Sequence, residues 1–427
     1  MKRSRMKESK EGEDEEGEDE EGKDEEGKDE GKGKGGKTED EEKDDTRDQL
    51  GDRIPEVTIS AFAETGLRGI INCCSIATLA NTLCAFLGVQ SLLDQLNTTS
   101  ATSYSLDNPF LSFVLEDCIE DSWDFGLAYS YLRQIWYTND WNAMIDVNWR
   151  WREEDQEKRQ EVLNGDQIVY PWLPPQHVWD LYSNWVVLYW MMDAHVGWPW
   201  PISHAWVDKK DRTTVWMPIN GYKWPVPIPK DADFNLIHIE MLNLGLECMW
   251  LDVLCLRQEG RWREDLHVEE WRLDAPTIRH VYFVADVVCY LSGLGQPLTL
   301  NEGDLESDQS WFRHAWMLQE IGMERVIARG TPEWTNACRV QGWRKLRDMQ
   351  NSDWLHDVLA EMQTRVSTNL VDKIAGLAFL TGSQQILAYS ESTSLEHAWT
   401  ALVDLMHGHA QAELFISCAE PGDGGPK

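Results

Sequence analysis

A carboxylate stands inside an apolar run at residues 249–258. The run reads M-W-L-D-V-L-C-L-R-Q, so Asp252 interrupts a stretch of strand-forming residues, and Arg257 and Gln258 follow it. A buried strand that breaks into polar residues places them at the carboxyl edge of a parallel sheet, where α/β proteins bind ligands. The chemistry expected here is that of a ligand cleft holding one acid and several hydrogen-bonding side chains.

A second carboxylate, Glu320, closes the segment Arg313–Glu320, which we predict to belong to a helix over 311–321. Because this helix follows the third predicted strand, it can add Arg313, Gln319 and Glu320 to the same sheet edge. Two alternatives stay open. Glu320 could be a surface residue or the ion-pair partner of an arginine, and Asp252 could serve only to hydrogen-bond backbone amides.

Strand and helix signals alternate around these residues. Apolar, strand-like runs occur at 201–207, 247–256, 287–291 and 325–328. Between them, one helix should begin near Asp231 or Asp233 and end at Gly245, and another should have Pro276 near its first turn. This order predicts a parallel sheet with helical crossovers, with Ser203 and Trp206 at the carboxyl end of its first strand.

Helical regions flank the predicted sheet. Apolar residues recur at helical spacing through 110–119 and 127–135. The first 52 residues are low in complexity, lack aromatic residues and cannot bury enough apolar surface to become ordered. We therefore predict four parts: a disordered acidic tail at 1–52, a helical N-terminal region at 53–170, an α/β domain at 171–335 and a helical C-terminal region at 336–427.

The chain is strongly acidic, with a formal net charge of −35. Residues 1–50 hold 22 Asp and Glu against 12 Lys and Arg, so most of the excess lies in the body of the chain. Nucleic-acid binding draws its affinity from Lys and Arg that neutralise phosphates. We therefore expect no nucleic-acid partner.

The spacing of the cysteines and the hydropathy of the chain indicate whether it binds a metal and where in the cell it is located. The nine cysteines include no C-x-x-C pair, so no metal site is expected. The charged N-terminus is unlike a secretory signal, which predicts an intracellular, cytoplasmic chain. No charged residue occurs between Arg68 and Asp94, a length that could span a bilayer, but polar residues such as Asn72 and Gln90 favour a buried helix over a membrane span.

Four ordered blocks carry a resemblance to the fungal heterokaryon incompatibility (HET) domain, in particular to basidiomycete-type members. The block at 249–258 resembles the family's W-I-D-x-x-C-I-N-Q signature. Three further blocks, at 202–206, 277–288 and 313–320, are similar to its L-S-Y-x-W, M-x-x-I-Y and R-x-W-x-x-Q-E elements. Departures are His204 in place of Tyr, Val207 in place of Gly and Arg257 in place of Asn.

The resemblance implies a TIR-like, flavodoxin-type α/β domain that acts in fungal non-self recognition and programmed cell death. Relatives of TIR type hydrolyse NAD through an oxocarbenium-like ribose, which a carboxylate can stabilise. On this basis Glu320 is the first catalytic candidate and Asp252 the second, with NAD as substrate and no cofactor required. The residues expected to hold NAD are Ser203, Trp206, Arg257, Gln258, Arg313 and Gln319, the arginines through the pyrophosphate.

A second class of function stays open beside the enzyme. The HET module could act without chemistry, by self-association or by binding an incompatibility partner, or the chain could be a diverged member with neither activity. NAD turnover would identify the first class, and concentration-dependent assembly would identify the second.

Overall fold

The computed structural model separates the chain into two units, Met1–Arg47 and Asp48–Lys427, and the residues it describes all belong to the second. The predicted disordered tail at 1–52 lies outside the described residues and stays a prediction. So does the part of the predicted 68–94 helix that precedes residue 79. The described residues are 79–100, 102–136, 141–192, 197–260, 263–298, 310–320, 325–329, 355–367 and 369–417.

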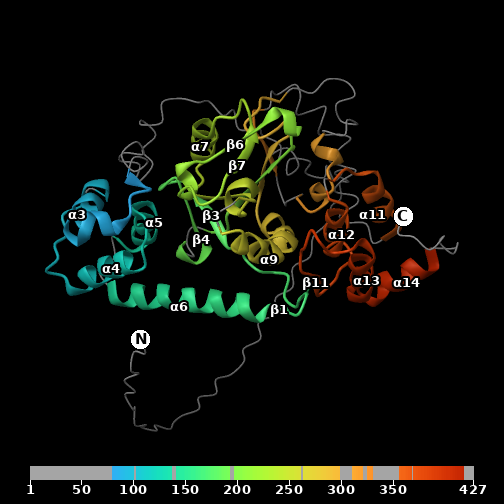
Figure 1. Ribbon diagram of the computed structural model, residues 1–427, viewed down its shortest axis with the longest axis horizontal. Helices are drawn as coiled ribbons and strands as arrows, with labels where there is room; N and C mark the ends of the chain where they lie inside the picture. Colours follow the sequence, from blue (N-terminus) through green and yellow to red (C-terminus); the bar gives the residue numbers. More distant parts are fainter. Residues whose placement is uncertain are drawn as a thin grey trace, which may run out of the picture. The chain divides into compact units, whose positions relative to one another are not determined.

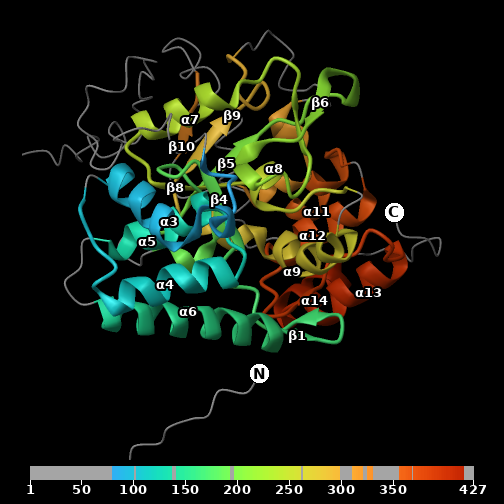
Figure 2. The same cartoon turned by 60° about the vertical axis from the view of Figure 1, so that its left-hand side comes forward.

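The N-terminal region is helical, as predicted. Its helices α3 to α6 surround a hydrophobic cluster of their own, which also receives residues of β4 (Figures 1 and 2). Pro109 opens α4, and the Asn108 side chain accepts a hydrogen bond from the Phe110 amide at 3.1 Å, so this start follows the usual capping chemistry. The helices are Cys84–Ser100 (α3), Pro109–Glu120 (α4), Phe125–Ile135 (α5) and Trp141–Glu161 (α6).

A six-stranded sheet forms the centre of the chain, with strand order β10-β9-β5-β8-β3-β4. Four neighbours, β10, β9, β5 and β8, run parallel, whereas β3 pairs antiparallel with β8 and β4 antiparallel with β3. The expectation of a wholly parallel sheet is therefore wrong, because a hairpin adds two strands at one edge. The strands are His177–Asp180 (β3), Trp185–Leu188 (β4), Trp200–His204 (β5), Cys248–Leu251 (β8), Val287–Tyr290 (β9) and Arg325–Ile327 (β10).

Across the sheet the parallel strands lie in the order β8, β5, β9, β10. Numbered by their place in the chain, this order is second, first, third, fourth. The connection from β5 therefore runs toward β8, whereas the connection from β9 runs the opposite way, toward β10. Such a reversal of direction creates a crevice at the carboxyl ends of the two strands beside it, which is where open α/β sheets bind ligands. Here the reversal lies between β5 and β9.

Helix α7 (Phe234–Asn243) begins and ends as the sequence predicted. The Asp233 side chain accepts a hydrogen bond from the Asn235 amide at 2.8 Å and caps the first turn. Gly245 has a φ of 76°, and its amide bonds the Leu242 carbonyl at 2.9 Å, which ends the helix in a left-handed turn.

Helix α9 (Glu264–Phe283) begins well before the predicted start, so Pro276 lies inside it and not in its first turn. Proline has no amide hydrogen, and the carbonyl four residues earlier loses its helical partner. That carbonyl, of Arg272, instead accepts a hydrogen bond from the Tyr389 amide at 3.1 Å. A remote segment thus replaces the bond that Pro276 removes.

The block at 249–258 is not one strand. Strand β8 ends at Leu251, and Asp252–Cys255 form the short helix α8. The Asp252 side chain accepts a hydrogen bond from the Val253 amide at 2.7 Å, and the Gln258 amide group donates to the Leu256 carbonyl at 2.9 Å. These local bonds favour a turn over the extended backbone that the apolar residues indicate.

The predicted helix over 311–321 is also wrong. The chain forms two short 3-10 turns instead, Trp311–Arg313 (η7) and Trp316–Leu318 (η8). The Arg313 carbonyl accepts from the Val366 amide at 2.7 Å, and the Ala315 amide donates to the Val366 carbonyl at 2.9 Å. Because both groups are committed to Val366, an α-helix cannot run through this segment.

The C-terminal region is mainly helical, and its helices share the hydrophobic cluster of the sheet. Strand β11 (Ile386–Leu387) completes a small sheet with β1 (Leu163–Asn164) and β2 (Gln167–Ile168). In Figure 1 the long helix α6 runs from the N-terminal helices toward β1 and the C-terminal helices. These helices are Leu355–Thr364 (α11), Leu370–Ala378 (α12), Leu395–Leu405 (α13) and Gly408–Ser417 (α14).

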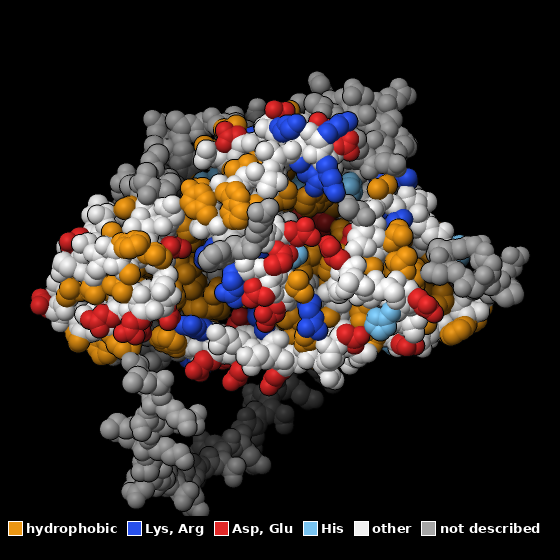
Figure 3. Space-filling model, viewed as in Figure 1, with side chains coloured by type: hydrophobic (Ala, Val, Ile, Leu, Met, Phe, Trp, Pro, Cys, Tyr) orange, Lys and Arg blue, Asp and Glu red, His pale blue; other side chains and the backbone are white. Residues whose placement is uncertain are grey.

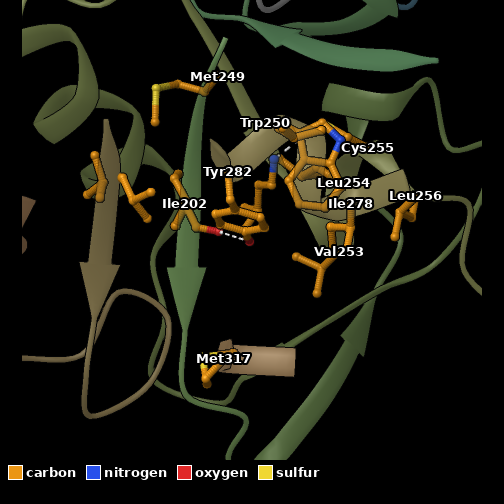
Figure 4. Packing of buried hydrophobic residues seen from close by; sticks show 14 of the residues in the cluster. Ile202, Met249, Trp250, Val253, Leu254, Cys255, Leu256, Ile278, Tyr282 and Met317 are labelled. Atoms are coloured by element: carbon orange, nitrogen blue, oxygen red, sulfur yellow. Dashed lines mark hydrogen bonds between the residues drawn. The ribbon is translucent and has the colours of Figure 1, made fainter. Parts of the chain in front are cut away.

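The largest core lies beneath the carboxyl half of the sheet. Trp250 packs edge-to-face on Tyr282 of α9, with ring centroids 5.8 Å apart, and both side chains are almost fully buried. Figure 4 shows this pair beside Ile202, whose backbone carbonyl accepts a hydrogen bond from the Tyr282 hydroxyl at 3.2 Å. The core therefore joins α9 to β5 at the level where β5 ends.

Two smaller elements complete the described chain. Strands β6 (Arg212–Val215) and β7 (Val226–Pro229) form a separate antiparallel ribbon after β5. Short 3-10 turns are found at Tyr189–Met191 (η2), Lys209–Asp211 (η4) and Pro218–Asn220 (η5). Within the described residues, no helix is both long and apolar enough to cross a membrane.

Candidate functional site

A chain of hydrogen bonds joins β5 to the segment that holds Glu320. The Ser203 hydroxyl donates to Glu320 Oε2 at 2.5 Å and accepts from the indole N–H of Trp311 at 2.7 Å. Ser203 is fully buried, and Glu320 is only 6% exposed. The predicted proximity of these two residues is therefore observed, and the site lies at the carboxyl end of β5, beside the reversal in strand order.

Burial, and to a smaller extent the nearby Asp252 carboxylate, raise the pKa of Glu320 to about 8. The hydrogen bonds from Ser203 and Tyr282 and the charge of His204 act in the opposite direction but do not offset burial. The Glu320 carboxyl is therefore neutral at pH 7. A neutral carboxylic acid can donate or accept a hydrogen bond, but it cannot stabilise a positive charge.

A second pair lies beside the first. His204 Nε2 and Asp252 Oδ1 are 3.0 Å apart, which joins the end of β5 to the start of α8. Burial acts to lower the pKa of His204, but Asp252, the Ala205 carbonyl and Glu320 together raise it above its ordinary value. The Asp252 side chain is 19% exposed, so this pair reaches solvent and Glu320 does not.

Trp206 packs beside the His204 ring, and Arg212 packs on Trp206. The rings of His204 and Trp206 have centroids 5.2 Å apart, and the Arg212 guanidinium lies 5.1 Å from the Trp206 ring. Trp206 is half-buried, so part of this side chain reaches solvent. The predicted position of Trp206 at the carboxyl end of the first strand is thus observed.

Ser203, His204 and Asp252 do not form a nucleophilic triad. The single Ser203 hydroxyl proton is directed at Glu320, and His204 uses Nε2 for Asp252 and places Nδ1 3.3 Å from the Ala205 carbonyl. No imidazole nitrogen is left to accept the serine proton. The arrangement suits an acid and a charged pair placed around a bound ligand, not attack by serine.

The remaining predicted ligand residues point elsewhere. Arg257 is buried, with Nε 3.2 Å from Glu270 Oε1 and its guanidinium 4.7 Å from the Trp224 ring. The Gln258 side chain bonds the carbonyls of Asp252 and Leu256, so it stabilises the turn of α8. Gln319 donates to the Ala375 carbonyl on α12 at 3.0 Å, and Arg313 is half-buried on η7.

Three residues at this site were not among the sequence candidates. Tyr282 and Trp311 both bond members of the Ser203–Glu320 chain. Burial lowers the pKa of His314 to about 4, and the charge of the nearby His204 contributes to this shift. Tyr282 was detectable, because it lies within the resembling block at 277–288.

Comparison with protein-family models, with curated proteins and with solved structures finds no match for this chain. Within the described ranges, no group of three or more His, Cys, Asp or Glu side chains is placed to hold a metal ion. The five cysteines described, Cys84, Cys118, Cys248, Cys255 and Cys289, are all buried and unpaired. The functional argument therefore rests on the geometry at the end of the sheet.

Proposed function

We propose that this chain is a HET-type effector of fungal non-self recognition that triggers cell death through NAD glycohydrolase-like activity. The observation that carries the proposal is convergence. Four blocks that are separate in the sequence meet at one end of the sheet, where Tyr282 of the block at 277–288 joins Ser203, His204, Asp252 and Glu320 of the other three. The second-first-third-fourth strand order also agrees with the flavodoxin-type, TIR-like fold that the resemblance implies.

The two carboxylates have different parts in this proposal. Asp252 is paired with His204 and reaches solvent beside the half-buried Trp206, so a nicotinamide or adenine ring can stack at that position. Glu320 lies behind it and becomes negative only above about pH 8. An oxocarbenium-like ribose needs a negative charge nearby, so NAD turnover should rise with pH until Glu320 is ionised.

The test is NAD consumption by the full chain and by Glu320→Gln. The amide keeps the shape of the acid and its bond to Ser203 but never ionises, so turnover should be lost while the fold remains. Asp372→Asn is the matched control, because Asp372 is a buried carboxyl bonded by the Tyr389 hydroxyl at 2.8 Å in the C-terminal helices. Equal turnover by the wild-type and Glu320→Gln chains would overturn the enzymatic role.

A non-enzymatic module is the second candidate, and an exposed aromatic cluster favours it. Trp172 is 41% exposed and Phe283 49% exposed, yet their rings pack 5.9 Å apart. Apolar groups that remain open to solvent together are typical of association surfaces. Trp172→Ala should then abolish concentration-dependent assembly in light scattering, whereas Trp216→Ala, an equally exposed tryptophan elsewhere, should not. A chain that stays monomeric while it kills cells would exclude this function.

A further inference from the structure

A cavity in the helical N-terminal region lies apart from the sheet and its carboxyl end. With Arg152 in place its enclosed volume is only about 20 Å³, and it is about 340 Å³ when the space open to solvent is included. Four aromatic side chains and two aspartates line much of it. They are Trp123, Tyr131, Trp149, Trp190, Asp117 and Asp121. We refer to the four aromatic residues as the aromatic cage.

The rings of the cage stand at steep angles to one another. Trp123 and Tyr131 have centroids 5.2 Å apart and an interplanar angle of 86°, and Tyr131 and Trp190 are 6.2 Å apart at 70°. Each of these two pairs therefore packs edge to face, and the planes of the rings that line the cavity differ in direction. Such a set of faces can surround a rounded ion from several sides, whereas a planar group can stack on only one of them.

Local structure holds the cage together. At the end of α4, Ser122 has a φ of 57°, and the Trp123 amide bonds the Cys118 carbonyl at 3.0 Å. This left-handed turn reverses the chain and folds Trp123 back against the helix that carries Asp117. Tyr131 and Trp190 are buried, at 5% and 9% exposure, whereas Trp149 is 38% exposed and stands at the rim.

A cation already occupies the rim. The Arg152 guanidinium lies 5.3 Å from the Trp149 ring and 5.9 Å from the Trp190 ring, and its NH1 is 3.1 Å from Asp121 Oδ2. Both distances to the rings are near the limit of about 6 Å for a cation over an aromatic face. The side chains of Arg152 and Asp121 are 30% and 37% exposed, so water competes for this pair and it holds Arg152 only weakly.

We propose that the aromatic cage is a binding site for a methylated ammonium ion, with Arg152 as an internal cation that the ligand displaces. Aromatic faces attract a quaternary ammonium through their negative quadrupole, and Asp117 and Asp121 add negative charge at the rim. The same chemistry is found in choline-type small molecules and in trimethyllysine side chains of proteins. In Figure 3 acidic and hydrophobic side chains lie next to each other over this helical region, on the left of the view.

The experiment measures binding of tetramethylammonium to the full chain by calorimetry and tryptophan fluorescence. The wild-type chain should bind weakly, and Arg152→Ala should bind about ten-fold more tightly, because the internal competitor is gone. Arg150→Ala is the control: it lies on the same helix, removes the same charge, and its exposed side chain does not line the cavity. An equal gain with Arg150→Ala would overturn the proposal in favour of a general effect of net charge.

Two further measurements complete the test. In the Arg152→Ala background, Trp149→Ala should weaken binding, and because Trp149 stands at the rim this change leaves the buried rings in place. Choline should bind better than its neutral isostere 3,3-dimethylbutanol, and equal affinity for the two would overturn the proposal. A trimethyllysine peptide compared with its unmodified form then distinguishes a protein source from a small-molecule source.

Discussion

Replacement of Glu320 by Gln should change how the stability of the fold depends on pH. Burial raises the pKa of this carboxyl to about 8, against an ordinary value of 4.5. Between these two values the native chain keeps the proton on Glu320 and the unfolded chain has lost it. The free energy of unfolding of the wild-type chain therefore falls as pH rises from about 4.5 to about 8.

The size of the effect follows from the interval between the two pKa values. Each pH unit corresponds to about 1.4 kcal/mol, so the full contribution is about 5 kcal/mol. Gln has the shape of the neutral acid and its oxygen can still accept from Ser203, so the two chains should be of similar stability near pH 4.5. Above pH 8 the Gln variant should be the more stable by about 5 kcal/mol.

Urea unfolding followed by tryptophan fluorescence, in half-unit steps from about pH 5 to about pH 9, gives this difference directly. Groups distant from Glu320 titrate alike in both chains, so their contributions cancel in it, whereas His204, whose pKa Glu320 raises, adds a smaller difference of its own. Glu270→Gln is the internal control, because burial raises the pKa of Glu270 to about 7. The difference in free energy of unfolding between this variant and the wild type should therefore level off about one pH unit earlier. A difference between wild type and Glu320→Gln that stays constant with pH would refute the reasoning, since Glu320 would then be ionised in the fold.

Three further changes test the packing and electrostatics of the flanking regions. Ser122→Gly should stabilise the chain by about 1 kcal/mol in thermal unfolding, because glycine adopts the left-handed turn without strain; no gain would contradict that strain. Gly126→Ala should destabilise it by about 2 kcal/mol, since the new Cβ would lie 2.8 Å from the buried Trp185 ring; a neutral effect would show that the ring can move. Arg159→Met should cost about 3 kcal/mol, because it leaves the buried Asp274 carboxylate, now 3.0 Å from Arg159, without its cation; Lys at position 159 should recover part of the loss.

Much of the central sheet could be predicted from the sequence, because its strands are short apolar runs bounded by turn residues. Strands β5, β9 and β10 lie within the expected 201–207, 287–291 and 325–328 or extend just one residue beyond. Helix α7 was predicted at both ends, since its cap and its terminal glycine are local signals. The rule that functional groups follow parallel strands also brought Ser203 and Asp252 to one edge.

The errors at the two predicted helices share a physical cause, which is that a remote backbone partner replaced a local one. Val366 bonds the backbone at Arg313 and Ala315, and Tyr389 bonds the Arg272 carbonyl that Pro276 leaves without a partner. Local periodicity contains no information about such partners. The protonation state of Glu320 was equally out of reach, because it depends on burial beneath side chains from three separate segments.

The pairing of β2 with β11 has a consequence for the synthesis of the chain. Ile168 in β2 is matched with Ile386 in β11, so one edge of β2 has no partner until almost the whole chain has been made. At about 5–20 residues per second, the ribosome needs on the order of 10–40 s to add the intervening segment. During that interval the nascent chain presents an open strand edge and an uncovered apolar surface, the features that chaperones bind and that promote aggregation. Expression of this protein should therefore respond to chaperone supply, and fragments that stop before β11 should be recovered in insoluble form.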